Sequence, residues 1–187
     1  MSPIQTVPHL AQLTTHSLNA NSQQAEDHPG SAGQAIIDVR ETLAPTARHL
    51  RVEVNWEICE KLREQYVTDA PSLTAAVSNL VLNAMQTATK VRLVAVQTGS
   101  GDLCVEVIDN GPGPPAEIAE DLFEPFVTSK PEGLGLGLPL VARAAARLAG
   151  NVKWERRADE TWFVITCQLS KDIQANHPNP FQASRRI

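Results

Sequence analysis

The chain lacks the clustered positive charge that nucleic-acid-binding proteins use. Its 187 residues include 16 Lys and Arg against 21 Asp and Glu, which gives a formal net charge of −5. Neutralising backbone phosphates requires Lys and Arg gathered into a patch or stripe. The closest basic pairs here are Arg156-Arg157 and Arg185-Arg186, which are too short for that. We therefore expect no nucleic acid among its partners.

Cysteines and long apolar runs are also scarce. Cys59, Cys104 and Cys167 are scattered and odd in number, and they form no CxxC pair, so neither a disulfide framework nor a zinc site is expected. No stretch approaches the ~20 apolar residues of a membrane span, and no charged segment followed by an apolar run opens the chain. These absences predict a cytoplasmic protein with reduced cysteines and no membrane span in this chain.

Two polar segments flank a region of regular alternation. Residues 1–33 contain NANSQQAEDHPGSAG and residues 171–187 read KDIQANHPNPFQASRRI, and both have the composition of linkers or tails. We predict a flexible N-terminal arm or linker at 1–33, a single domain at 34–170 and a loose C-terminal tail at 171–187. A domain of about 130 to 150 residues is long enough to bury its own core.

Apolar spacing predicts the elements of this domain. Helices are expected over 35–50, interrupted by Pro45, over 71–88 with Pro71 in the first turn, and over 138–150 with Gly150 as the C-cap. Strands are expected over 51–59, 90–98, 102–109, 151–156 and 161–169, with hairpin turns at 99–101 and 158–159. The predicted fold class is α+β, a two-layer α/β sandwich in which helices cover one face of a mixed, mostly antiparallel sheet.

The helix expected at 71–88 has two distinct faces. With about 100° between successive residues, one apolar face holds Leu73, Val77, Leu80, Val81, Ala84 and Ala88. Asn79, Asn83 and Gln86 lie nearly opposite and are flanked by Leu82 and Met85. A surface helix would tolerate these amides, but the apolar flanks favour the wall of a cleft. Amide oxygens there suit a hard cation, such as Mg²⁺, that already carries phosphate oxygens and water.

Two glycine-containing segments supply what such a cleft needs. The strand at 102–109 runs into Asn110-Gly111-Pro112-Gly113, which places Asp109 above a tight turn. Its carboxylate can accept a hydrogen bond from the exocyclic amine of adenine, and an ordinary Asx turn is the alternative. Residues 133–139 read GLGLGLP ahead of a helix, whose N-terminal amides suit phosphate. This segment is neither a P-loop nor a dinucleotide fingerprint.

The order of four motifs carries a family resemblance. The asparagine-bearing helix, DNGPG, FEPFVTSK and GLGLGL follow one another along the chain. They resemble the N, G1, F and G2 boxes in the ATP-binding catalytic domain (HATPase_c) of sensor histidine kinases, within the GHKL or Bergerat-fold ATPase superfamily. The resemblance covers roughly residues 34–170 and implies the Bergerat ATP-binding fold, with ATP and Mg²⁺ as cofactors.

The resemblance also implies site residues. It makes Asn83 the Mg²⁺ ligand, with Asn79 and Gln86 beside it, and it makes Asp109 the partner of the adenine amine. Asn79, Asn83 and Lys130 are the expected catalytic residues, with Lys130 available to the phosphates. The other nucleotide contacts that it implies, with the two phenylalanines anchoring a lid, are Gly111, Gly113, Phe123, Phe126, Gly133, Leu134, Gly135, Leu136, Gly137 and Leu138.

Two positions and the length of the lid differ from other members of the superfamily. ATP-hydrolysing members such as gyrase carry a glutamate four residues before the magnesium asparagine, where it activates water. That place is Asn79 here, so we expect slow hydrolysis because an amide cannot act as the general base. The lid between Phe126 and Gly133 is short, and Leu134 stands where threonine is common.

The chain shows no phosphoacceptor motif, in which a histidine precedes an acidic residue. His9, His16, His28, His49 and His177 all lack that acid, and the polar stretch 20–33 leaves no room for a second hairpin helix after His16. We expect the domain to donate the γ-phosphate of ATP to a histidine in a separate phosphoacceptor domain, with a response regulator as the further partner. A stand-alone nucleotide-binding module and an anti-sigma-type serine kinase remain the alternatives.

Overall fold

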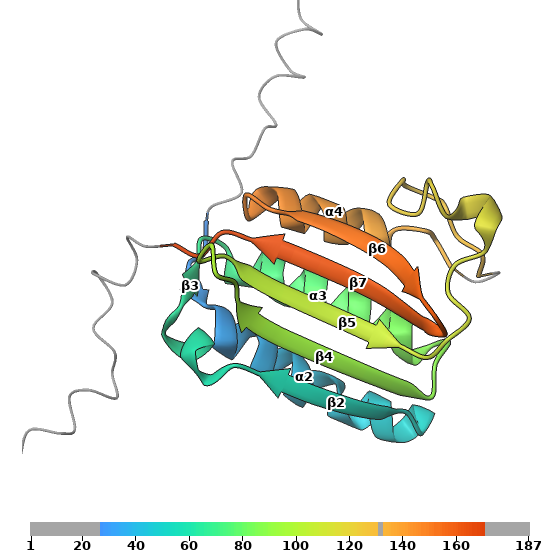
Figure 1. The fold of residues 1–187 in the computed structure, drawn as a ribbon, viewed down its shortest axis with the longest axis horizontal. Helices are drawn as coiled ribbons and strands as arrows, with labels where there is room; N and C mark the ends of the chain where they lie inside the picture. Colours follow the sequence, from blue (N-terminus) through green and yellow to red (C-terminus); the bar gives the residue numbers. More distant parts are fainter. Residues whose placement is uncertain (1–26, 131–132, 171–187) are drawn as a thin grey trace, which may run out of the picture.

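Two layers make up the computed structural model, which describes residues 27–130 and 133–170. One layer is a five-stranded sheet, and the other consists of three helices packed on one of its faces (Figure 1). The helices are α2 (Ala32–Leu50), α3 (Ala70–Met85) and α4 (Gly137–Arg147). The strands of the sheet are β2 (Glu53–Ile58), β4 (Lys90–Gln97), β5 (Leu103–Asp109), β6 (Asn151–Arg157) and β7 (Glu160–Cys167).

The sheet has the strand order β2-β4-β5-β7-β6. The pair β2–β4 is parallel, and the other three pairs are antiparallel. A short pair, β1 (Gly30–Ser31) with β3 (Tyr66–Val67), lies beside this sheet, and two 3₁₀ turns, η1 (Glu60–Glu64) and η2 (Ala116–Ile118), complete the elements. The predicted α+β sandwich with a mostly antiparallel sheet is therefore confirmed.

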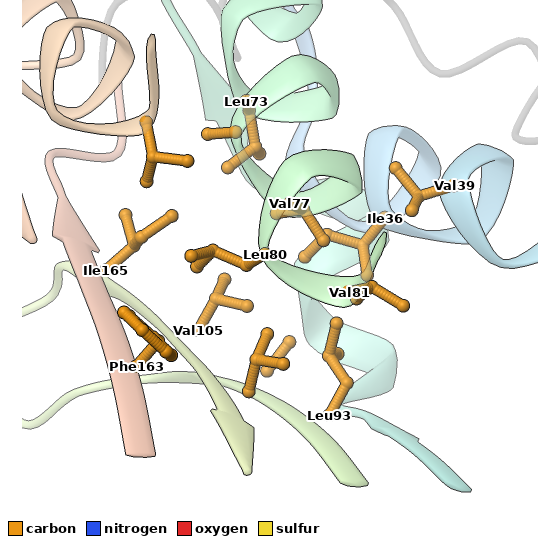
Figure 2. Close-up of a cluster of buried hydrophobic side chains, with 14 of the residues drawn as sticks. Ile36, Val39, Leu73, Val77, Leu80, Val81, Leu93, Val105, Phe163 and Ile165 are labelled. Atoms are coloured by element: carbon orange, nitrogen blue, oxygen red, sulfur yellow. The ribbon is translucent and has the colours of Figure 1, made fainter. Parts of the chain in front are cut away.

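The core lies between α3 and the covered face of the sheet. Alternate residues of each central strand point inward, as period-two alternation requires, and they meet the apolar face of α3. All six residues predicted for that face are buried, although Ala88 lies beyond the end of α3 at Met85. Figure 2 shows the central part of this cluster, formed by Ile36 of α2, Val77, Leu80 and Val81 of α3, Leu93 of β4, Val105 of β5, and Phe163 and Ile165 of β7.

Helix α2 differs from its prediction in two ways: Pro45 does not interrupt it, and it begins earlier than residue 35. It runs unbroken past Pro45, because this proline lies on the exposed side while Leu43 and Ala47 continue the contact with the core. It begins at Ala32, where Ser31 caps it by accepting a hydrogen bond from the amide of Gln34 at 3.2 Å. The predicted domain start at residue 34 thus falls inside the first turn. The rest of the predicted arm, residues 1–26, and the predicted tail, 171–187, lie outside the described residues.

Gly150 has a different role from the C-cap that the sequence suggested. Helix α4 ends at Arg147, and Ala149 adopts the left-handed conformation (φ 52°). The amide of Gly150 still donates to the carbonyl of Ala145 at 2.9 Å. A Cβ atom at position 150 would lie 1.8 Å from the carbonyl oxygen of Thr166 in β7. Glycine is required here because the helix end passes directly against a strand.

We expect Gly150→Ala to lower the free energy of unfolding by about 2 to 4 kcal/mol, because a backbone carbonyl must move to admit the methyl group. Gly99→Ala is the matched control, since nothing lies within 4 Å of a Cβ atom there. It should change stability by less than about 0.5 kcal/mol. Urea denaturation of both variants measures the difference, and equal stabilities would contradict the close approach.

Candidate functional site

A cavity of about 450 Å³ opens where the end of α3, the start of α4, the end of β5 and the start of β7 come together. This volume lies within the range of about 300 to 1,000 Å³ that is usual for small-molecule sites. The predicted site residues that line it are Asn83, Gln86, Asp109, Gly113, Lys130, Gly133, Leu134, Gly135, Leu136, Gly137 and Leu138. Asn79, Gly111, Phe123 and Phe126 are not part of its lining, although each contacts residues that are.

Asp109 is a buried carboxylate at the end of β5. Only 5 % of the residue is exposed, and one carboxylate oxygen accepts a hydrogen bond from the amide of Gly111 at 2.8 Å. Burial raises the pKa of Asp109, although the Gly111 bond and the positive charge of Arg156 act in the opposite direction. Asp109 therefore forms an Asx-type turn and also lines the cavity, because only one of its carboxylate oxygens bonds to Gly111.

The turn after Asp109 needs its glycines for space. A Cβ atom on Gly111 would lie 2.8 Å from the Asp109 carboxylate and 3.1 Å from the carbonyl oxygen of Thr87. Gly113 has a φ of 75°, and a Cβ atom there would lie 3.2 Å from the hydroxyl oxygen of Thr161. The backbone of the turn thus lies close to Thr87, just after α3, on one side and to Thr161 of β7 on the other.

Sequence reasoning missed Thr161 and Arg156 at this end of the cavity. Thr161 is 2 % exposed, lines the cavity and pairs directly with Asp109 across β5 and β7. One guanidinium nitrogen of Arg156 donates to the hydroxyl oxygen of Thr161 at 2.7 Å and to the carbonyl oxygen of Gly111 at 2.6 Å. The hairpin turn at 158–159 could have placed Arg156 opposite Thr161. The pairing of β7 with β5, by contrast, has no local sequence signal.

At the other end of the cavity, two amide oxygens converge on one cation. The ammonium group of Lys130 donates to the side-chain oxygen of Asn83 at 3.3 Å and to that of Gln86. Burial lowers the pKa of Lys130. Among the described residues no group of three or more His, Cys, Asp or Glu side chains could hold a metal. Neutral amide oxygens, completed by phosphate and water, do suit Mg²⁺, so this donor set fits the predicted ion.

Helix α4 starts directly against the asparagines of α3. A Cβ atom on Gly137 would lie 3.2 Å from the side-chain oxygen of Asn79 and 3.6 Å from the amide nitrogen of Asn83. The Asn79 amide nitrogen is occupied, because it donates to the carbonyl of Ala75 at 2.8 Å. The first backbone amides of α4 have no partner within the helix and carry partial positive charge. They border the same cavity as the amide oxygens.

The two predicted lid phenylalanines differ in their surroundings. Phe123 packs edge-to-face on Phe163, with ring centroids 6.5 Å apart, and so holds its segment to the sheet. Phe126 is 77 % exposed and adopts a left-handed backbone (φ 68°), and its amide donates to the carbonyl of Gly135 at 3.0 Å. It fastens FEPFVTSK to the glycine loop through its backbone, while its ring lies outside the cavity lining.

Comparison with known proteins identifies the family. Residues 68–171 match the family described as "Histidine kinase-, DNA gyrase B-, and HSP90-like ATPase". The chain belongs to this family. Together with the sensor kinases and solved catalytic domains below, this match confirms the expected resemblance to the ATP-binding domains of sensor histidine kinases.

Its relatives include two bacterial sensor kinases. The chain is 37 % identical to "Sensory histidine kinase/phosphatase NtrB" of Rhodobacter capsulatus over 117 residues, which cover 54 % of this chain and 33 % of that protein. It is 28 % identical to "Sensor histidine kinase ZraS" of Salmonella typhimurium over 80 % of this chain and 28 % of that protein. This chain thus spans a third or less of the length of these relatives.

Solved structures share the fold. The catalytic domain of histidine kinase ThkA superposes with a TM-score of 0.67 at 23 % identity, covering 76 % of this chain and 95 % of that one. Full-length ShkA, solved in complex with AMPPNP, gives a TM-score of 0.63 at 26 % identity, covering 84 % of this chain and 35 % of that one.

Among the described residues, no helix has both the length and the apolarity to cross a bilayer.

Proposed function

We propose that this family member binds Mg-ATP as the catalytic ATP-binding domain of a two-component sensor histidine kinase and donates the γ-phosphate to a histidine on another domain or protein. A response regulator would then take the phosphoryl group. The observation that carries this proposal is the convergence of a buried acceptor, a pair of amide oxygens and a helix N-terminus on one cavity. These three features match the base, the metal and the phosphates of one nucleotide.

The end of the cavity that holds Asp109 supports binding of an adenine base. Asp109 offers a carboxylate to an exocyclic amine, surrounded by apolar lining from Ile118, Leu122 and Phe163. An apolar pocket with few placed polar groups is typical of a nucleobase site. The ShkA complex shows that a structurally similar protein binds an ATP analogue. Adenine is therefore the base that we assign to this end.

The groups at the other end of the cavity support binding of Mg²⁺ and transfer of the phosphoryl group. When bound with ATP, Mg²⁺ neutralises charge on the phosphates and on the phosphoryl group in transit. Asn83 and Gln86 would hold it through their side-chain oxygens, Lys130 would pair with phosphate oxygens, and the amides at the start of α4 would donate to them. These groups position and stabilise the transferring phosphoryl, which is most of what such a reaction requires of the protein.

The environment of Asn79 supports transfer over hydrolysis. An amide cannot take a proton from water at neutral pH, and the nitrogen of this one is held by the carbonyl of Ala75. Activation of water therefore lacks a base at this position. Transfer of the phosphoryl group to a nucleophile on a partner does not require activated water, so it needs no base at position 79.

Exposed apolar side chains beside the cavity support a docked partner. Leu134 is 75 % exposed and also lines the cavity, and Leu140, on the first turn of α4, is 52 % exposed. Phe126, which is hydrogen-bonded to Gly135 next to Leu134, is exposed as well, and we call these three residues the mouth surface. An amphipathic helix carrying the acceptor histidine would cover such a surface with its apolar face.

We expect the chain to bind ATP more tightly with Mg²⁺ than with EDTA. The ratio of these two affinities should fall at least about tenfold in Asn83→Ala. Loss of even an outer-shell partner of a metal commonly costs 10 to 100-fold in metal affinity. Titration calorimetry measures both ratios. Asn55→Ala is the control, because Asn55 is an asparagine of β2 whose side chain bonds only to Glu57 among the described residues. Absence of heat for the wild type with either ATP or ADP would overturn the proposed function.

A further inference from the structure

We propose that Arg156 is a specificity-determining residue for the purine base, because it fixes the Thr161 hydroxyl as a hydrogen-bond donor beside the acceptor Asp109. This inference rests on the proposed ATP site and goes beyond it. It assigns the choice of adenine over guanine to a side chain outside the family motifs in the sequence. Arg156 acts through Thr161, so it is a positioning residue.

Three neighbouring strands bring the residues into one row. Asp109 of β5 pairs with Thr161 of β7, and Thr161 pairs with Arg156 of β6. The side chain of Arg156 lies on the helix-covered side of the sheet, as the neighbouring Trp154 does, and reaches both Gly111 and Thr161. Asp109 and Thr161 are each at least nine-tenths buried and both line the cavity. A base placed there meets both groups together.

The chemistry of the guanidinium determines the direction of the hydrogen bonds. Arginine has five N–H donors and no acceptor, so Thr161 must accept the bond of 2.7 Å between them. A hydroxyl has one proton, and in Thr161 that proton must point away from Arg156. Among the residues that the structure describes, Thr161 makes no further side-chain hydrogen bond. Its proton is therefore available to an acceptor in the cavity, directly or through one water.

The resulting pair of groups matches one purine. Adenine presents an amine donor next to a ring-nitrogen acceptor, which pairs with the Asp109 carboxylate and the Thr161 hydroxyl proton. Guanine presents a carbonyl acceptor next to a ring N–H donor, so its carbonyl would face a carboxylate and its N–H would face a proton. Buried polar groups left unpaired in this way are a strong source of discrimination.

Arg156 is needed because a hydroxyl on its own has no fixed polarity. With the guanidinium in place, one of the two lone pairs of Thr161 is occupied, and a second N–H donor would be brought next to a positive charge. Without it, the hydroxyl can accept from the ring N–H of guanine as readily as it donates to adenine. Arg156 also supports the acceptor side of the pair, since its charge opposes the rise in the pKa of Asp109 that burial causes. Its second bond, to the carbonyl oxygen of Gly111, holds the turn that carries this carboxylate.

A cycle of variants and nucleotide analogues tests the assignment on the whole chain. The analogue 1-deaza-ATP has a C–H group in place of the ring-nitrogen acceptor. We expect it to bind the wild type about tenfold more weakly than ATP, the effect of one lost hydrogen bond. In Thr161→Val the two nucleotides should bind nearly equally. In Arg156→Met the hydroxyl can still donate to ATP but can also accept from guanine, so the preference for ATP over GTP should fall about tenfold. Arg157→Met, whose guanidinium bonds to Glu155 on the open face, should behave as the wild type.

The donor-only character of the side chain gives a second comparison. Arg156→Lys keeps a donor without an acceptor and should retain the preference for ATP over GTP, whereas Arg156→Gln, whose amide can also accept, should lower this preference about tenfold. This pair decides the question if Arg156→Met does not fold. An unchanged preference for ATP over GTP in Arg156→Gln and Arg156→Met would overturn the proposal and leave Arg156 with a purely structural role. Absence of ATP binding by the wild type would instead overturn the proposed function itself.

Discussion

Asp109→Asn is expected to weaken ATP binding by about 1 to 3 kcal/mol while making the free protein more stable at neutral pH. The loss of affinity follows from the amine contact. One carboxylate oxygen accepts from the amide of Gly111, and the other is available to the adenine amine. An asparagine that keeps the Gly111 bond through its oxygen presents an amide donor to the amine instead. Removing a buried hydrogen bond to a charged group typically has this magnitude.

The gain in stability follows from the burial of the carboxylate. Burial raises the pKa of Asp109 above its unfolded value. A carboxyl shifted in this direction contributes stability that is fully present below the unfolded pKa and is lost as pH rises through the folded pKa. At pH 7 the ionised form therefore destabilises the free protein. The asparagine carries no charge, and its oxygen can still accept the hydrogen bond from the amide of Gly111.

Calorimetry with ATP and urea denaturation at pH 7 measure the two effects. Asp159→Asn is the matched control, because Asp159 is exposed in the turn between β6 and β7. It should change neither quantity. A variant at position 109 that binds ATP normally would show that Asp109 only shapes the turn. A variant that loses both binding and stability would show that the carboxylate is structural.

The parts of this fold that the sequence predicts are those with local causes. The apolar face of α3 repeats with the helical period, and the alternation along β4 and β5 repeats with the strand period, so both could be placed without knowing what they contact. Asn79 and Asn83 were interpretable for the same reason, since their spacing puts them on one side of the helix. The order of the four motifs then identified the family.

The parts that sequence analysis missed depend on contacts between distant segments. Gly150 follows a helix, as a C-cap glycine would, but its true constraint is the carbonyl oxygen of Thr166 on a later strand. Arg156 looked like one member of a surface basic pair until the sheet order placed it two strands from Asp109. Pairing across such a separation is set by the packing of the whole sheet, which no short window of sequence records.

The isolated chain is expected to bind ATP without phosphorylating itself, and transfer is expected only when a phosphoacceptor helix is supplied. In-line transfer needs the acceptor nitrogen at the γ-phosphate. Of the histidines that the structure describes, His28 and His49, neither lines the cavity. The carbonyl of His28 accepts from the amide of Ala70 at the start of α3, whereas Asn83 lies 13 residues further along this helix. At 1.5 Å per residue this separation is about 20 Å.

The experiment incubates the chain with γ-labelled ATP, alone and with a separately purified dimerising hairpin that carries an acidic His motif. Acid-labile label should appear on the hairpin and not on the chain. Leu140→Asp, in the mouth surface, should reduce transfer at least about tenfold without changing ATP affinity, because a charge there opposes the docking of an apolar helix face. Leu50→Asp is its control, since Leu50 is similarly exposed (44 %) at the end of α2. Acid-labile label on the chain alone, lost on replacing His16, would place the acceptor within this chain and refute the requirement for a partner.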